Sequence, residues 1–313
     1  MRSLFSSQRK PGWMSILPQG SDITLVHAVR NAASRPEIRL LDRFVLEQGM
    51  SDALSRLRLA RQLNSFACTT LLGEGEYSIA QFDAPAVPKE ERKEALRWSL
   101  RDVVNFPVES ACVDVLDIPS DGLPGRAAGV LVVSAAERAV RARVAPFEEA
   151  HISLDAVDVP EMAQRNVAAL LEDENRGLAF LRLDESGLML TLTFRGELVA
   201  VRHSEMNTQQ LTAQEGEQQT RIRERLVLEV QRSLDNFDRQ YSYIPVSRTV
   251  LACDPPVEGL QEELAANLYV PVQALDLAQV MDFPRVPELR DVRCQARHLL
   301  AIGAALRDGG CAP

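Results

Sequence analysis

The side chains that most often carry metal or nucleophilic chemistry are present in this sequence but lie far apart along it. They are His27, His151, His203 and His298, together with Cys68, Cys112, Cys253, Cys294 and Cys311. No pair of cysteines has Cys-x-x-Cys spacing, and no histidine has a cysteine or acidic residue at the spacing of metal ligands. A metal site is therefore not supported, and the odd number of scattered cysteines favours reduced thiols in a cytosol.

Lysine, serine and paired carboxylates give no catalytic motif either. None of the lysines follows a glycine-rich loop, which excludes a P-loop. Ser186 does not stand in the Gly-x-Ser-x-Gly turn of hydrolases. Asp155 and Asp158 fall on a predicted strand, where their odd spacing places them on opposite faces. These residues are expected to be solvated or capping groups.

The composition is that of an ordinary globular protein. A chain of 313 residues with 46% hydrophobic and 25% charged residues can bury a large core and has room for two domains or more. Its net charge of −9 argues against a nucleic-acid partner, which requires a basic surface. No apolar run approaches the roughly 20 residues of a membrane span, and no signal peptide opens the chain. We therefore expect a cytoplasmic protein that reaches a membrane only through a partner.

The first part of the chain alternates strands with one helix. β-Branched and alternating apolar residues predict strands at 13–17, 22–29, 38–46, 67–72 and 77–82. A helix with leucines at helical spacing is expected between the third and fourth of these strands, over residues 51–63.

The segment 88–115 is expected to form one helix and then one strand. Pro88 suits the first turn of a helix, where its missing N–H has no intrahelical partner, and Pro107 is expected to end the helix. The apolar face of this helix carries Leu96, Leu100, Val103 and Val104. Trp98 lies on the opposite side, so its indole either packs on a second element or is left for a partner. Packing is favoured because large aromatic side chains are usually buried.

The rest of the chain repeats the opening pattern. A strand at 128–134, a helix at 136–150, a strand at 152–159 and a helix at 160–171 come first. Three strands follow at 178–183, 188–194 and 198–203, then one long helix at 208–241. The chain ends with a strand at 249–253, a helix at 257–268, a short strand at 270–272 and a helix at 294–306. Two openings of three strands indicate an internal near-repeat.

Three stretches, in this order along the chain, resemble the PilM family of pilus-assembly proteins. They are Pro-x-x-Glu with Glu-Ala-Leu-Arg-Trp, Phe-Pro-Val-Glu and Val-Asp-Val within 88–115, Asp-Val-Pro-Glu-Met-Ala-Gln-Arg-Asn at 158–166, and Leu-Leu-Ala-Ile-Gly-Ala-Ala-Leu-Arg at 299–307. The nearest resemblance is to the MshI branch, which belongs to the mannose-sensitive haemagglutinin (MSHA) pilus system. It implies an α/β fold of the actin-like, ribonuclease H-like type, with two halves and a small inserted α/β subdomain.

The same resemblance sets the expected boundaries. Residues 1–84 and 151–175 would form the first half, residues 85–150 the insertion and residues 176–313 the second half. The terminal helix of the second half is expected to pack back on the first.

Actin-like ATPases hold a nucleotide between the two halves, with acidic and glycine-rich turns around phosphate and Mg²⁺. Gly20 and Ser21 are the remnants in the first turn, but no acidic residue precedes them at the required spacing. Asp184 and Gly187 remain in the second turn, with one residue more between them than in Asp-x-Gly, and a plain hairpin explains them equally well. In the third turn, 252–259, two prolines replace the glycines and cannot take positive φ.

Three altered turns argue against hydrolysis. We therefore expect a protein that is not an enzyme, with no catalytic residue, cofactor or metal, while weak ATP binding stays open. The resemblance implies a scaffold of a type IV pilus machine that binds the cytoplasmic tail of a PilN-like inner-membrane protein and links it to the motor ATPases. Capture of a tail requires apolar pockets and pairing at a sheet edge. The resemblance implies that a groove beside the inserted subdomain takes this tail. The residues expected at that groove are Arg97, Trp98, Arg101, Tyr77 and Ile79.

Two other functions stay open. One is an actin-like ATPase with a nucleotide-driven cycle, which would require Mg²⁺-dependent ATP binding. The other is the cytoplasmic part of a type II secretion assembly protein, which has the same architecture and normally continues into a membrane span.

Overall fold

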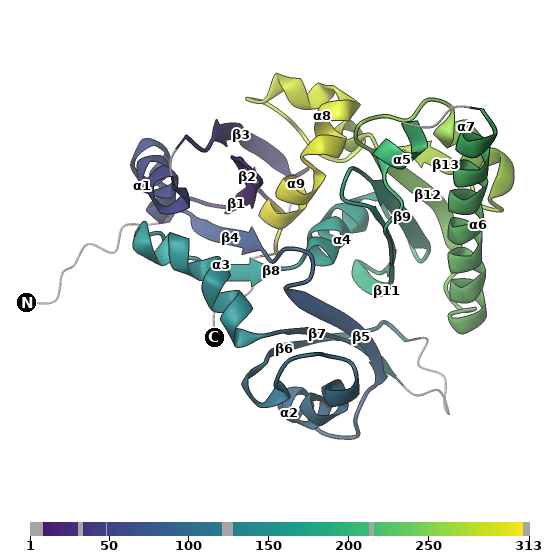
Figure 1. Cartoon of the computed structure of the whole chain (residues 1–313), viewed down its shortest axis with the longest axis horizontal. Coiled ribbons are helices and arrows are strands. Elements are labelled where there is room, and N and C mark those ends of the chain that lie inside the picture. Colours follow the sequence, from purple (N-terminus) through teal and green to yellow (C-terminus); the bar gives the residue numbers. More distant parts are fainter. Residues whose placement is uncertain (1–8, 31–33, 48, 121–127, 213–215, 309–313) are drawn as a thin grey trace, which may run out of the picture.

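The structure is a computed structural model that describes residues 9–30, 34–47, 49–120, 128–212 and 216–308 (Figure 1). Three parts of the sequence-based expectations lie outside these residues. They are Cys311, residues 121–127 of the loop after the strand at 111–115, and residues 213–215 of the long helix. Within the described ranges the strands form two five-stranded sheets and one three-stranded sheet.

The two larger sheets repeat one topology. The first has the order β3-β2-β1-β4-β8 and consists of β1 (Trp13–Gln19), β2 (Asp22–Val29), β3 (Glu37–Val45), β4 (Ala67–Leu71) and β8 (Ala156–Asp158). The second has the order β11-β10-β9-β12-β13 and consists of β9 (Gly177–Leu183), β10 (Leu188–Phe194), β11 (Glu197–Ser204), β12 (Val246–Cys253) and β13 (Val272–Ala274). In each sheet three antiparallel strands are followed by two parallel ones.

Two short helices lie between the sheets. They are α4 (Pro160–Leu171) and α9 (Leu299–Ala305), and Figure 1 shows them at the centre of the molecule. Small and aliphatic side chains on both helices, among them Ala163, Val167 and Ile302, are fully buried in one cluster. Because α9 packs against β1, β2, β4 and α4, the end of the chain returns to the first half. Burial of this apolar surface is the main force that holds the halves together.

The outer helices cover the far faces of the sheets. In the first half these are α1 (Met50–Arg61) and α3 (Glu137–Glu149), which pack on each other. In the second half they are α5 (Thr208–Thr212), α6 (Glu217–Gln240) and α7 (Leu260–Asn267), whereas α8 (Val292–Arg297) packs on the inner cluster with α4 and α9. One apolar stripe of α6 faces the core, since Leu226, Val230, Leu234 and Phe237 are buried. No helix in these described parts of the chain is long and apolar enough to cross a membrane.

The inserted subdomain consists of the sheet β5-β7-β6 and the helical segment that covers it. Its elements are β5 (Tyr77–Asp83), α2 (Arg92–Arg97), β6 (Cys112–Asp117) and β7 (Gly129–Ala135). The expected boundaries at 85 and 150 are wrong at both ends. β5 pairs with β7 along its whole length and so belongs to the insertion, whereas α3 packs on α1 and belongs to the first half. A strand's partner is decided by long-range pairing, which its own sequence does not reveal.

Three predicted helices are interrupted. The helix expected after Pro88 is a 3₁₀ turn (Lys89–Glu91), then α2, then a 3₁₀ segment (Trp98–Asp102), because Asp102 and the valines after it are poor helix formers. The helix at 208–241 becomes α5 and α6, and the terminal helix becomes α8 and α9, separated at His298. The strand expected at 152–159 is shorter and is limited to β8. Ile152, which precedes β8, is buried in the core of the first half.

Candidate functional site

A cavity of about 1280 Å³ lies between the two halves. It is bordered by the β1–β2 turn, the β9–β10 turn, the segment after β12 and the end of α8. These are the turns at which the sequence predicted remnants of a nucleotide site. The volume is ample for a small ligand, so the side chains around the cavity decide what it can hold.

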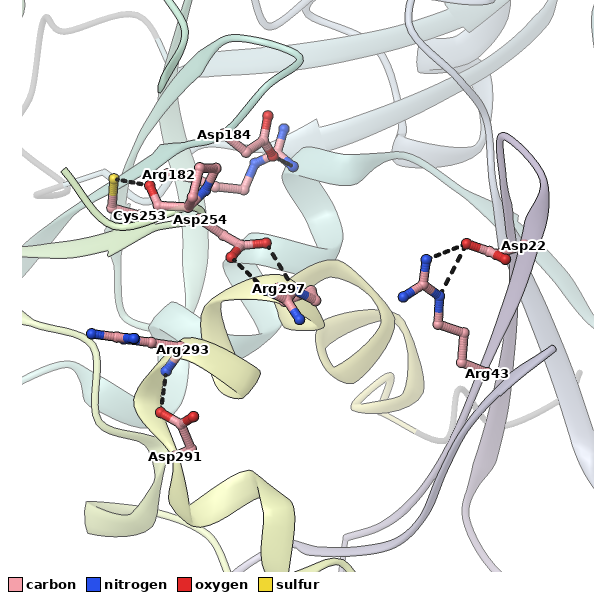
Figure 2. Close-up of polar contacts among 10 residues, drawn as sticks. Asp22, Arg43, Arg182, Asp184, Cys253, Asp254, Asp291, Arg293 and Arg297 are labelled. Atoms are coloured by element: carbon pink, nitrogen blue, oxygen red, sulfur yellow. Dashed lines mark hydrogen bonds and ion pairs between the residues drawn. The ribbon is translucent and has the colours of Figure 1, made fainter. Parts of the chain in front are cut away.

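The acidic residue at the first turn is paired with an arginine. Gly20 lines the cavity with φ of 57°, whereas Ser21 is exposed and its carbonyl oxygen accepts a hydrogen bond from the Leu46 N–H. The acidic residue that follows, Asp22, accepts a hydrogen bond of 3.0 Å from Nε of Arg43 on β3. Figure 2 shows this pair at the rim of the cleft.

The second turn uses its acidic side chain internally. Asp184 accepts a hydrogen bond of 2.8 Å from the Ser186 N–H and forms an ion pair of 2.6 Å with Arg182. Gly187 has φ of 148°, and a Cβ atom there would lie 2.7 Å from the Ser204 carbonyl oxygen. Glycine is thus required by the hairpin itself, which accounts for Gly187 without a ligand.

The third turn also pairs an aspartate with an arginine. Asp254 directly follows β12 and accepts hydrogen bonds of 3.3 and 3.4 Å from Arg297 at the end of α8 (Figure 2). Hydrogen bonding to this carboxylate raises the pKa of Arg297. Pro255 and Pro256 then occupy the positions at which backbone N–H groups would approach a nucleotide.

The aspartates and backbone groups of these three turns do not fit a nucleotide with bound Mg²⁺. Each aspartate at the three turns is neutralised by an arginine, whereas Mg²⁺ prefers free carboxylate and water oxygens. Where glycine-rich turns would present N–H groups to phosphate, the third turn carries two prolines.

A buried carboxylate lies deeper in the same cavity. Glu161 on α4 is fully buried, and both of its oxygens lie 2.8 Å from Oη of Tyr77, which donates to them. His203 Nε2 on β11 lies 2.9 Å from Glu161 Oε1. Burial, and then the nearby Glu161 carboxylate, raise the pKa of Tyr77, so its hydroxyl stays protonated as a donor. This junction joins the insertion, the first half and the second half.

Neither Glu161 nor His203 was predicted from the sequence as a site residue. Glu161 follows a helix-starting proline, a position at which glutamate normally faces solvent and favours the helix dipole. His203 is 42 positions away in the sequence, so no spacing connects the two. Only Tyr77 was among the predicted site residues, and for a different role.

A second groove, of about 480 Å³, lies between the insertion and the first half. We call it the insertion groove and define it by Cys112 and Leu116 of β6, Val157 and Asp158 of β8, and Met162 of α4. Among the described strands β6 pairs only with β7, and β8 only with β4. Two edge strands therefore present unpaired backbone groups to the same groove.

Charged side chains share the lining of this groove with apolar ones. Asp158 forms an ion pair with Arg307, whose guanidinium also lies 5.4 Å from the Trp13 ring centroid. Burial raises the pKa of Asp158, although Arg307 and the Val159 N–H act in the opposite direction. The groove thus combines apolar side chains, two strand edges and charged groups in its lining.

The predicted partner-binding residues do not come together. Tyr77 and Ile79 line the cavity between the halves, whereas Arg97, Trp98 and Arg101 line neither of the two cavities. Arg97 donates hydrogen bonds of 2.8 Å to the carbonyl oxygens of Val108 and Ala111, which is a structural role.

The expected burial of Trp98 is wrong. Its side chain is 54% exposed, and the Arg101 guanidinium lies 4.1 Å from the centre of its ring. The helical segment that carries Trp98 packs on the small sheet through Leu96 and Leu100. In the described chain no other element covers its outer face.

Two sheets of identical strand order, packed about paired central helices with a ligand-sized cleft between them, define an actin-like fold. The expected fold class, α/β with two halves and an inserted subdomain, is therefore confirmed.

Comparison with solved structures agrees with this class. The chain is similar to a "PilM-PilN type IV pilus biogenesis complex" with a TM-score of 0.75 and 18% identity, over 94% of this chain and 98% of the other. It is also similar to the cytoplasmic domain of EpsL, an inner-membrane component of the type II secretion system of Vibrio cholerae, with a TM-score of 0.50 and 12% identity, over 95% of each chain. No protein-family model matches the sequence, and no curated protein sequence matches it. At these identities the likeness is one of fold.

Proposed function

We propose that this protein is a cytoplasmic, non-catalytic scaffold of a type IV pilus assembly machine of the MSHA type, in the role of an MshI protein. It binds the cytoplasmic tail of a PilN-like inner-membrane protein and links that protein to the motor ATPases. The likeness to the PilM–PilN complex over nearly the whole chain supports the class of machine. The ion-paired turns of the cleft support a role without nucleotide hydrolysis.

The insertion groove is the observation that carries this proposal. An extended peptide placed there can pair its backbone with the edge of β6 or β8 and bury alternate side chains against Leu116, Val157 and Met162. Neither step requires a catalytic group. The groove also lies beside the inserted subdomain, where the family resemblance implies that the tail binds.

The test is fluorescence anisotropy with a labelled synthetic peptide that carries the cytoplasmic tail of a PilN-like protein from the same cell. Cys112 is exposed on β6 and lines the groove, so Cys112→Arg places a bulky cation in the path of the peptide. We expect this variant to bind about tenfold more weakly than the wild type. Val45→Arg is the matched control, because Val45 is 68% exposed on β3 at the opposite edge of the first sheet.

If both variants weaken peptide binding equally, the tail binds outside the insertion groove. If the folded wild-type protein does not bind the peptide, the proposal is wrong. A role in type II secretion, which the fold likeness to the EpsL domain supports, is the second candidate. A labelled peptide from the cytoplasmic segment of a type II secretion inner-membrane protein separates the two, since the correct tail should bind more tightly.

A further inference from the structure

The inserted subdomain is attached to one half of the protein and packed on the other. Its chain leaves the first half after β4 at Leu71 and returns after β7 at Ala135, directly before α3. Figure 1 shows the inserted sheet beneath both of the larger sheets. Its covalent connections therefore belong to the first half alone.

Apolar contacts fasten the insertion to the second half. Leu131 of β7, which is 3% exposed, belongs to one buried cluster with residues of β10, β11 and α6. Ile118, which follows β6, is part of the same cluster. Separating the insertion from the second half would expose these side chains to water, which is unfavourable in proportion to the apolar area.

One polar contact lies directly at the same interface, and a second links the two parts through α4 of the first half. Tyr243, which follows α6 in the second half, donates a hydrogen bond of 2.8 Å to the carbonyl oxygen of Pro119 in the insertion. At the other end of the sheet, Tyr77 of β5 and His203 of β11 both contact the buried carboxylate of Glu161. Removing either partner from a fully buried carboxylate is costly, because its charge loses a hydrogen-bonded neighbour.

We propose that the inserted subdomain is a strap that fixes the width of the cleft between the two halves. Opening the cleft requires the second half to move away from the first, and the strap moves with the first half. The apolar interface, the Tyr243 hydrogen bond and the contact of His203 with Glu161 oppose that movement. The relative position of the halves is therefore set by the chain's own contacts rather than by a nucleotide. This inference does not depend on the tail-binding role of the insertion groove.

The experiment measures the distance between the halves by pulsed electron spin resonance. Spin labels on non-natural amino acids replace Val45 of β3 and Leu228 of α6, which are exposed and lie on different halves. The wild type should give one narrow distance distribution that millimolar Mg–ATP leaves unchanged. Leu131→Ala combined with Tyr243→Phe truncates an apolar contact and removes the hydrogen bond of the same interface, and should add a second, longer distance.

Tyr269→Phe is the matched control, since Tyr269 is a tyrosine of the second half with 59% exposure and its loss of a hydroxyl should change nothing. A folded double variant with the wild-type distribution would overturn the strap, and so would a wild-type distance that shifts with Mg–ATP. If the double variant does not fold, Tyr243→Phe alone is measured, with the same two outcomes.

Discussion

A Cβ atom added at Gly303 would lie 2.0 Å from the carbonyl oxygen of Ala163, so the helices α9 and α4 cross with their backbones in direct contact. Asn166 reinforces this crossing, because its side-chain N–H donates a hydrogen bond of 2.9 Å to the Gly303 carbonyl oxygen. The crossing lies between the two sheets, where both halves meet. Only glycine allows so close an approach.

Replacing Gly303 by alanine should therefore destabilise the protein, although alanine favours helices. The methyl group would force the two helices apart, and we expect a loss of about 3 kcal/mol in the free energy of unfolding, at the upper end of overpacking effects. Urea unfolding followed by circular dichroism measures it. The control is Gly49→Ala, because no atom lies within 4 Å of a Cβ there, and its cost should be about 0.5–1 kcal/mol as a helix cap. Equal losses would contradict the close crossing.

Calorimetric titration with ATP and Mg²⁺ should give no saturable heat up to millimolar concentrations. The physical reason is that Asp22, Asp184 and Asp254 are each paired with an arginine and offer no free carboxylate to the metal. A cooperative melt establishes that the sample is folded. Saturable, Mg²⁺-dependent heat would instead favour the actin-like ATPase.

The stability of the protein should fall as the pH drops below the usual pKa of histidine. Burial lowers the pKa of His27 from 6.5, so the unfolded chain takes up a proton at a pH at which the folded chain does not. Stability from this group is present above about pH 6.5 and is lost as the pH falls towards the lower folded value.

The variant His27→Gln tests this origin, since an amide N–H can replace the contact of 3.0 Å between His27 Nε2 and the Pro11 carbonyl oxygen without titrating. Its free energy of unfolding should depend less on pH between 7 and 5 than that of the wild type. His151→Asn serves as control, because His151 is exposed and asparagine tolerates its φ of 55°. An unchanged slope for His27→Gln would show that other groups cause the acid loss.

Thiol labelling at about pH 8 should distinguish two cysteines by their surroundings. Cys112 is exposed on an edge strand, whereas Cys68 is fully buried and burial raises its pKa to about 12. Cys112 should react with a disulfide reagent at once and Cys68 only when the protein unfolds. Peptide mapping by mass spectrometry assigns the labelled sites. Fast reaction of Cys68 in the folded protein would contradict the packing of β4.

Much of the local structure follows from the sequence. Strands such as β2 (Asp22–Val29) and β10 (Leu188–Phe194), and the helix α4 (Pro160–Leu171), have the predicted bounds. Their signals are local, namely β-branched runs between turns and a proline at the first position of a helix. The repeat of three strands likewise lies in the order of segments, and with the family resemblance it was sufficient to predict the fold class.

The candidate sites could be predicted from the sequence only in part. The altered turns could be recognised residue by residue, but their arginine partners could not, because Arg43 and Arg297 are supplied by other elements. The insertion groove likewise depends on β6 and β8 remaining unpaired on their outer sides. An edge is a property of the whole sheet, and no single strand encodes it.

The sequence by itself thus determined the elements, their order and the loss of acidic and glycine residues at the nucleotide turns. Tertiary structure alone decided that β5 joins the insertion, that Glu161 meets Tyr77 and His203, and that Trp98 remains exposed. The reason is physical. Periodicity and capping act over a few neighbouring residues, whereas strand pairing and the burial of a charge depend on groups that only folding brings together.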